Sequence, residues 1–170
     1  YLMANEPVNA LYYGIQTDAG HLDGSIPFYD WDSWHRMQLV YDGTESSNNV
    51  RLYLDGNLED VRTHTGQLVT NAYDLTFGSS QWGAGQMFSG RLDEIHVLNR
   101  ALADTELAMF GDLILDFPLD GSTEDNGPFN EQLHLSKHAS FMDDPVVPGR
   151  EVLYIDGKDG DTNSPVWIRE

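Results

Sequence analysis

Short segments that alternate between hydrophobic and polar residues run along most of the chain, which is the pattern of β-strands. The segment 91–98 (RLDEIHVL) shows this alternation most clearly. A strand over these residues places Asp93 on the same face as Ile95 and Val97, and therefore on the expected core face. A carboxylate on a core face is costly unless a cation, an Arg side chain or backbone N–H groups meet it. The pattern alone leaves these partners open.

The same alternation predicts further strands over 11–17, 34–41, 50–54, 58–62, 73–78, 113–119, 132–142, 152–155 and 166–168. Turns rich in Asp, Gly and Pro separate them. Asp55-Gly56 is the clearest hairpin signal, because Gly accepts the positive φ of a tight turn. One short helix is expected over 103–110, ending at Gly111. Many short strands and one helix predict an all-β fold, a two-sheet antiparallel jelly-roll sandwich.

Composition narrows the possible functions. A chain of 170 residues is long enough for one domain with a core of its own. Its net charge of −19 excludes the basic surface that nucleic acids and anionic membranes require, and no apolar segment is long enough to insert into a membrane. Cys is absent, which removes thiolate catalysis and zinc–sulfur sites. Because the chain starts at Tyr1, we expect a mature product, an excised module or part of a longer protein.

Two groups of motifs carry a resemblance to a known family. The first is Trp34-His35 followed by VYDG at 40–43 and VRLYLDG at 50–56; the second is FSGRLDE at 88–94 followed by NRAL at 99–102. In this order they resemble the central and closing parts of the laminin-G-like, concanavalin-A-like lectin/glucanase jelly-roll superfamily. The resemblance covers residues 1–111. Residues 112–170 resemble the opening strands of the same fold, through LDFPLDG at 115–121 and VLYIDG at 152–157.

The two parts, 1–111 and 112–170, therefore stand in reverse order. Three arrangements follow from this order. The chain is a permuted domain that closes on itself, a segment cut from tandem repeats, or a subunit whose opening strands complete a neighbour by strand exchange. Residues 112–170 are too few to bury a core alone, so we expect them to pair with strands of a 1–111 segment and to place Asp156 near Asp93.

The resemblance also implies a structural calcium ion. Members of the superfamily often hold one with the Asp of the closing strand and the turn after an opening strand. Carried over, the ligands are Asp93, Asp156, Gly157, Asp159 and Asp161, although Lys158 departs from the expected turn. Carboxylate and carbonyl oxygens are the ligands that calcium prefers. A solvated acidic turn is the alternative.

Catalysis finds little support, because Asp93 and Glu94 fall on opposite faces and no paired carboxylates of the glycosidase type are present. His134 and His138 with Asp143 and Asp144 offer either a transition-metal patch or a solvated surface. Exposed aromatic rings are better candidates for function. Tyr29, Trp31 and Trp82 lie in polar or Gly-rich loops, where rings either stack on sugars or close the ends of the sandwich.

We therefore expect a non-catalytic, calcium-stabilised module of a secreted or cell-surface protein. Its expected partner is a glycan or another cell-surface ligand, and its expected role is adhesion or carbohydrate recognition. The alternative is a structural repeat or subunit of an extracellular fibre or scaffold that assembles by strand exchange with copies of itself.

Overall fold

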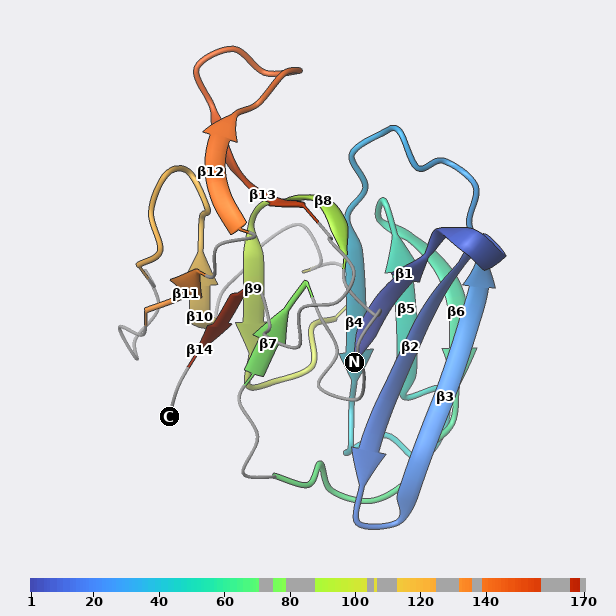
Figure 1. Ribbon diagram of the computed structural model, residues 1–170. Helices are drawn as coiled ribbons and strands as arrows, with labels where there is room; N and C mark the ends of the chain where they lie inside the picture. Colours follow the sequence, from blue (N-terminus) through green and yellow to red (C-terminus); the bar gives the residue numbers. More distant parts are fainter. Residues whose placement is uncertain are drawn as a thin grey trace. The chain divides into compact units, whose positions relative to one another are not determined.

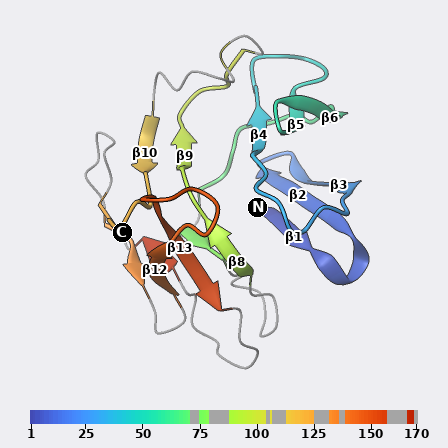
Figure 2. The same cartoon turned by 90° about the horizontal axis from the view of Figure 1, so that it is seen from above.

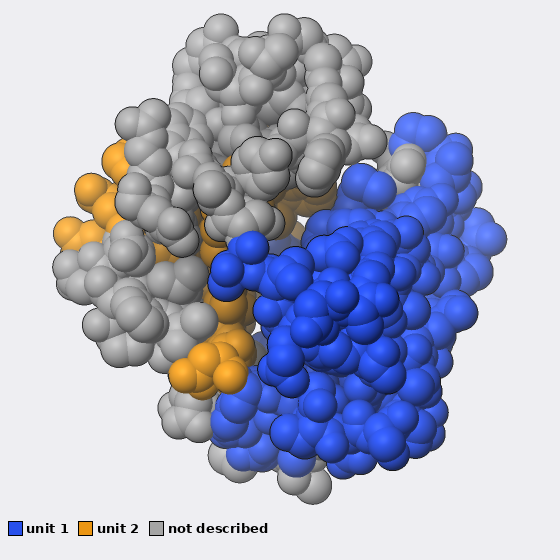
Figure 3. Space-filling model, turned by 90° about the horizontal axis from the view of Figure 1, so that it is seen from below, with its two compact units in different colours: residues 1–71, 100–110 blue, residues 72–99, 111–170 orange. Residues whose placement is uncertain are grey.

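A computed structural model describes residues 1–70, 75–78, 88–103, 106, 113–124, 132–135, 139–156 and 166–168 (Figure 1). All strand pairs in this part of the chain are antiparallel, and the fold is all-β, as the alternating pattern predicts. The chain divides into two compact units (Figure 3). Unit 1 comprises residues 1–71 and 100–110, and unit 2 comprises residues 72–99 and 111–170.

The described residues of unit 1 form two three-stranded sheets. In the first, β1 (Leu2–Asn5), β2 (Ala10–Thr17) and β3 (Gly20–Pro27) lie in the order β1-β2-β3, with the 3₁₀ turn η1 (Glu6–Val8) between β1 and β2. In the second, β4 (Met37–Tyr41), β5 (Val50–Leu54) and β6 (Asn57–Arg62) lie in the order β4-β5-β6. Asp55 and Gly56 join β5 to β6 with φ of 52° and 80°, which confirms the predicted hairpin turn.

Both sheets of unit 1 contribute to one hydrophobic core. Its buried members come from β2, β3 with the residue after it, and β5: Leu11, Tyr13, Ile15, Ile26, Phe28, Val50 and Leu52. Alternation decides this set, because successive side chains of a strand point to opposite faces. The Tyr13 hydroxyl donates to Oδ2 of Asp60 at 2.8 Å, which links β2 in one sheet to β6 in the other. Unit 1 is therefore a small sandwich with a polar tie across it.

The described residues of unit 2 form three sheets. Their strands are β7 (Leu75–Phe77), β8 (Ser89–Leu92), β9 (Ile95–Leu98), β10 (Leu113–Phe117), β11 (His134–Leu135), β12 (Ala139–Asp143), β13 (Glu151–Asp156) and β14 (Val166–Ile168). Their orders are β12-β13-β8, β11-β14-β7 and β10-β9. Figure 2 shows β13 between β12 and β8.

A second hydrophobic core holds unit 2 together. Phe117, Leu119, Leu133, Ala139, Leu153 and Ile155 are its buried members. Five of the partly buried hydrophobic residues packed against them lie on or beside β7, β8, β9 and β11: Phe77, Phe88, Leu92, Ile95 and Leu135. Segments from before and after residue 111 thus share this core, and each buries its hydrophobic face against the other.

The predicted pairing between the two parts of the sequence is present within one chain. β13 pairs with β8, β10 with β9, and β14 with β7, so strands from 112–170 join strands from 72–99. Strand exchange between copies stays a prediction. The division into residues 1–111 and 112–170 differs from the two compact units, because residues 72–99 cluster with the later part of the chain.

Three expectations about elements need correction or lie outside the description. The segment 91–98 is two strands, β8 and β9, because Glu94 has a φ of 49° and interrupts the extended backbone. The sequence pattern missed β1 and β3, the latter because Asp23, Gly24 and Pro27 obscure its alternation. The helix expected over 103–110 lies mostly outside the described residues. Of those that are described, Glu106 is assigned as 3₁₀ helix.

Candidate functional site

Asp93 lies at the break between β8 and β9 and is paired with an arginine. Its side chain is 10% exposed, and its Oδ2 is 3.3 Å from Nη1 of Arg150, the residue before β13. Arg150 also contacts Oδ2 of Asp144, at 2.5 Å from Nη2 and 2.8 Å from Nε. The side chain of Asp144 is fully buried. One guanidinium therefore bridges two carboxylates.

The two carboxylates of this triad are not equivalent. Burial raises the pKa of Asp93 above its usual value, and the more distant Arg150 offsets this only in part. The backbone N–H of Val146 donates to Oδ1 of Asp144 at 2.8 Å and, together with Arg150, holds the pKa of Asp144 below its usual value although burial opposes this. Arg150 is thus bound mainly to Asp144 and reaches across to Asp93.

Of the residues expected to bind calcium, the structure describes Asp93 and Asp156, and these two lie apart. Asp156 pairs with Ser89 at the far end of β8, four positions from Asp93, or about 13 Å along a strand. The register therefore does not bring Asp156 beside Asp93 as expected. Gly157, Asp159 and Asp161 lie outside the described residues. Within the described ranges no group of three or more His, Asp or Glu side chains is arranged to hold a metal ion. At Asp93 the donor set does not fit calcium, because a guanidinium already contacts the carboxylate.

The sequence left two interpretations of His134, His138, Asp143 and Asp144, a transition-metal patch or a solvated surface, and neither fits Asp144. A buried carboxylate bound by Arg150 forms neither a solvated surface nor an open metal patch with His134. Asp143 is exposed, and His138 lies outside the described residues.

Tyr29 and Trp31 follow β3 and differ in exposure. Tyr29 is 75% exposed. Trp31 packs against the core of unit 1, its ring lies edge-on to Phe28 at 4.6 Å between centroids, and its Nε1 donates to Oδ1 of Asn9 at 3.1 Å. The ring of Tyr29 is therefore open to solvent, whereas that of Trp31 is held by packing and by a hydrogen bond. Trp82 lies outside the described residues.

Two carboxylates and a histidine lie close to this loop. His35 places Nδ1 at 2.7 Å from Oδ2 of Asp55 and Nε2 at 3.6 Å from Oδ2 of Asp30. Its ring lies edge-on to Phe28 at 4.9 Å. Burial acts to raise the pKa of Asp55, but hydrogen bonds from His35 and from the N–H of Arg36 outweigh it and lower that pKa. Asp30 and Asp55 keep side chains 58% and 46% exposed, so both can accept further hydrogen bonds.

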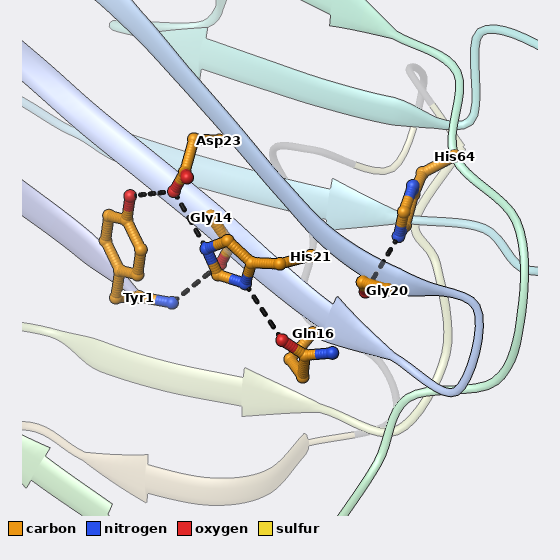
Figure 4. Close-up of polar contacts among 7 residues, drawn as sticks. All are labelled: Tyr1, Gly14, Gln16, Gly20, His21, Asp23 and His64. Atoms are coloured by element: carbon orange, nitrogen blue, oxygen red, sulfur yellow. Dashed lines mark hydrogen bonds and ion pairs between the residues drawn. The ribbon is translucent and has the colours of Figure 1, made fainter.

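A hydrogen-bonded network joins Tyr1, the residue before β1, to residues of β2 and β3 (Figure 4). The hydroxyl of Tyr1 donates to Asp23, whose Oδ1 also lies 2.9 Å from Nε2 of His21. Nδ1 of His21 is 3.1 Å from Oε1 of Gln16. The hydrogen bond from Tyr1, and then the contact with His21, lowers the pKa of Asp23. The phenol ring of Tyr1 lies over Gly14, where an added Cβ would approach it to 2.5 Å.

A second network at the end of β2 is structural. Thr17 is 1% exposed, and its hydroxyl lies 2.7 Å from the carbonyl of Thr65 and 3.0 Å from Nε2 of His64. Nε2 of His64 is also 3.2 Å from the carbonyl of Gly20 (Figure 4). These bonds tie the segment after β6 to the β2–β3 turn.

The outward positions of β3 and its continuation form one polar stripe with an aromatic end. His21, Asp23, Ser25 and Pro27 are exposed, while Gly24 and Ile26 between them are buried. The N–H of Phe28 donates to the carbonyl of Asn9 at 2.8 Å, so the ladder with the β2 side extends by one residue and leaves Phe28 buried. Tyr29 continues this alternation on the exposed side. We call His21, Asp23, Ser25 and Tyr29 the β3 stripe.

Sequence reasoning found Tyr29 but missed the rest of the β3 stripe. The missed signal was the odd-numbered polar residues of 21–25, whose alternation is visible once the segment is recognised as a strand. Arg150 was missed because nothing local connects it to Asp93.

Comparison with known proteins places the chain in a family. The family model of the concanavalin A-like lectin/glucanases superfamily, of laminin-G type, matches residues 6–108. No curated protein and no solved structure matches the chain. In the described residues no helix has the length and apolarity to cross a membrane. The family match extends over more than half of the chain and agrees with its antiparallel all-β architecture, so the protein belongs to the concanavalin A-like lectin/glucanase superfamily.

Proposed function

We propose that the chain is a non-catalytic carbohydrate-recognition module of a secreted or cell-surface protein, and that the β3 stripe of unit 1 binds the glycan. The observation that carries this proposal lies along the exposed side of β3 and the residues after it, where Tyr29, whose ring is 75% exposed, follows carboxylate, imidazole and hydroxyl groups. An exposed aromatic face suits the apolar face of a sugar ring, and fixed polar groups suit its hydroxyls.

The polar groups of the stripe are held before any ligand arrives. Asp23 accepts from Tyr1 and contacts His21, and His21 is fixed on its other side by Gln16. Groups fixed in advance lose less rotamer entropy on binding. The side chain of Asp23 is 60% exposed, so its remaining capacity to accept hydrogen bonds faces solvent. Both ring nitrogens of His21 are already engaged, so His21 acts by holding Asp23 and Gln16 in place.

A non-catalytic role is supported by the state of the two adjacent carboxylates of the closing motif. Asp93 is nearly buried and bound to Arg150, whereas Glu94 is exposed. They do not form the pair of carboxyl groups that flanks a glycosidic bond in glycosidases.

The rival function, a structural repeat assembled by strand exchange, has less support. β7, β8 and β9 already pair with β14, β13 and β10 within the chain. A neighbouring copy is therefore not needed to complete these pairs.

Calcium at residues 156–161 stays part of the proposal on the strength of the family match, and Asp93 is left out of the ligand set.

The test is binding to a panel of immobilised polysaccharides and oligosaccharides. We expect the unmodified chain to bind at least one of them, Tyr29→Ala to lose most of that binding, and Tyr29→Phe to retain it, because stacking requires the ring and not the hydroxyl. Tyr154→Ala, which removes a partly buried ring from β13 of unit 2, is the control for loss of an aromatic ring outside the stripe and should bind normally. Absence of binding across neutral and charged glycans, or equal binding by Tyr29→Ala, would contradict the proposal.

A further inference from the structure

The triad of Asp93, Arg150 and Asp144 contains the one residue of the closing motif, Asp93, to which the resemblance assigned a calcium ion. The residues belong to one unit and to adjacent strands, since Asp93 follows β8 and Arg150 precedes β13, with which β8 pairs. Two carboxylates that converge on one point need a positive charge there. In this chain the positive charge at that point is a side chain.

The loop between β12 and β13 is built to present Arg150 at this point. Asp144 and Arg150 close the loop, because the N–H of Asp144 donates to the carbonyl of Arg150 at 2.7 Å. The N–H of Arg150 donates back to the carbonyl of Val147 at 3.3 Å. Within the loop, Asp144 accepts from Val146 with one oxygen and from Arg150 with the other. The guanidinium is therefore held by its own loop before it reaches Asp93.

Geometry also disfavours a shared site for Arg150 and a divalent ion. Calcium takes six to eight oxygen ligands at about 2.3–2.6 Å. Oδ2 of Asp93 lies 3.3 Å from one guanidinium nitrogen, and Oδ2 of Asp144 lies within 2.8 Å of two others. An ion bound to these oxygens would stand against the guanidinium, so Arg150 would have to leave.

We propose that Arg150 replaces calcium as the cation that fastens the end of β8 to the β12–β13 loop, so that Asp93 is a structural residue and holds no metal. The consequence is that this junction keeps its strength whatever the calcium concentration around the protein. Any calcium that the chain binds is held elsewhere, without Asp93.

The first experiment compares thermal unfolding in excess chelator and in excess calcium for the unmodified chain and for Asp93→Asn. We expect Asp93→Asn to lower the melting temperature by the same amount in both conditions. If calcium stabilises the unmodified chain, that stabilisation should survive in Asp93→Asn, because the ion is bound elsewhere. A calcium-induced rise in melting temperature that disappears in Asp93→Asn would overturn the proposal.

The second experiment observes the guanidinium directly in the unmodified chain and uses a variant only to assign its resonance. The Nε–H resonance of Arg150 in a ¹H–¹⁵N correlation spectrum, assigned by its loss in Arg150→Lys, should keep its position when calcium replaces chelator. Displacement of the guanidinium by the ion would move that resonance, and such a shift would also overturn the proposal. The shift itself is read in the unmodified chain, so it does not depend on the stability of Asp93→Asn.

A third comparison separates the role of Arg150 from a general loss of positive charge. Arg150→Gln should lower the melting temperature strongly, because it leaves the buried Asp144 without its cation, and adding Asp144→Asn should restore part of the loss. Arg91→Gln, at an exposed position of β8, removes the same charge from the same unit and should have little effect. Equal effects of Arg150→Gln and Arg91→Gln would contradict the assigned role.

Discussion

Replacing Tyr13 by Phe removes one hydroxyl group and leaves the ring, so it isolates the polar tie between the two sheets of unit 1. The residue is fully buried, and its hydroxyl donates to Oδ2 of Asp60 at 2.8 Å. A hydrogen bond to a charged group stabilises a fold by about 1.5–3 kcal/mol. Asp60 keeps its contacts with Nε of Arg62 at 3.0 and 3.1 Å. We therefore expect Tyr13→Phe to lower the free energy of unfolding at neutral pH by about 1.5 kcal/mol, the lower end of this range.

The same bond makes stability depend on alkaline pH. Burial, followed by the hydrogen bond to Asp60, raises the pKa of Tyr13 to about 12. In the unfolded chain a phenol titrates near about pH 10. The neutral form is thus favoured in the folded state, and this stabilisation is complete below about pH 10 and lost as pH rises through about 12. After allowance for solvent screening at the hydroxyl, the unmodified chain should lose about 1–2 kcal/mol more than Tyr13→Phe over this range.

The assay is urea unfolding followed by tryptophan fluorescence at a series of pH values from neutral to about 12. Tyr1, whose pKa is raised to about 12 first by burial and then by Asp23, is present in both proteins and cancels from the comparison. Tyr29→Phe removes an exposed hydroxyl and is the control. If the free energies of unfolding of the unmodified chain and of Tyr13→Phe fall in parallel over this range, the tie between Tyr13 and Asp60 is not what the structure indicates.

Three further substitutions test the packing of unit 1. Gly24→Ala should lower the free energy of unfolding by about 1–3 kcal/mol in urea titrations, because its Cβ would lie 2.2 Å from the buried ring of Tyr13; a neutral effect would contradict this packing. Asn49→Ala should lower the free energy of unfolding by about 1–3 kcal/mol, because the buried amide donates to the carbonyls of Glu45 and His64 and accepts from the N–H of His64. Ser46→Ala in the same loop should change the free energy of unfolding little. Trp31→Ala should lower the melting temperature clearly, whereas Tyr29→Ala should cost no more than about 0.5 kcal/mol, so equal melting curves for the two variants would contradict their different packing.

Much of the fold could be predicted because turns and buried strand faces are specified by residues that are neighbours in the sequence. Asp55-Gly56 specifies its own turn through residues that tolerate positive φ, and the alternation in 11–17 and 50–54 selects the buried face directly. β3 was hidden because Gly24 takes the place of an inward apolar side chain. The reason is packing from another strand: the ring of Tyr13 fills the space above Gly24. That reason cannot be seen in the residues of β3 alone.

The candidate site was predicted only where its residues act alone. Tyr29 in a polar loop was recognised, and it is exposed. Asp93 was expected on the core face, where a cation, an Arg side chain or backbone N–H groups would have to meet it. Its side chain is nearly buried, and Arg150 becomes its partner only through the pairing of β13 with β8. The alternation used to place Asp93 does not continue past Glu94, because the left-handed backbone there ends the strand. Contacts between distant segments are set by register, which a single sequence does not display.

The most direct measurement of the central claim is an NMR titration of the ¹⁵N-labelled chain with the best-binding glycan from the panel. The account predicts that backbone amide shifts gather on the β3 stripe, at residues 21–29, and on the neighbouring residues 12–16 of β2, with little change in unit 2. Shifts concentrated on β8, β13 or the β12–β13 loop instead would place recognition in unit 2 and contradict the assignment of glycan binding to the β3 stripe.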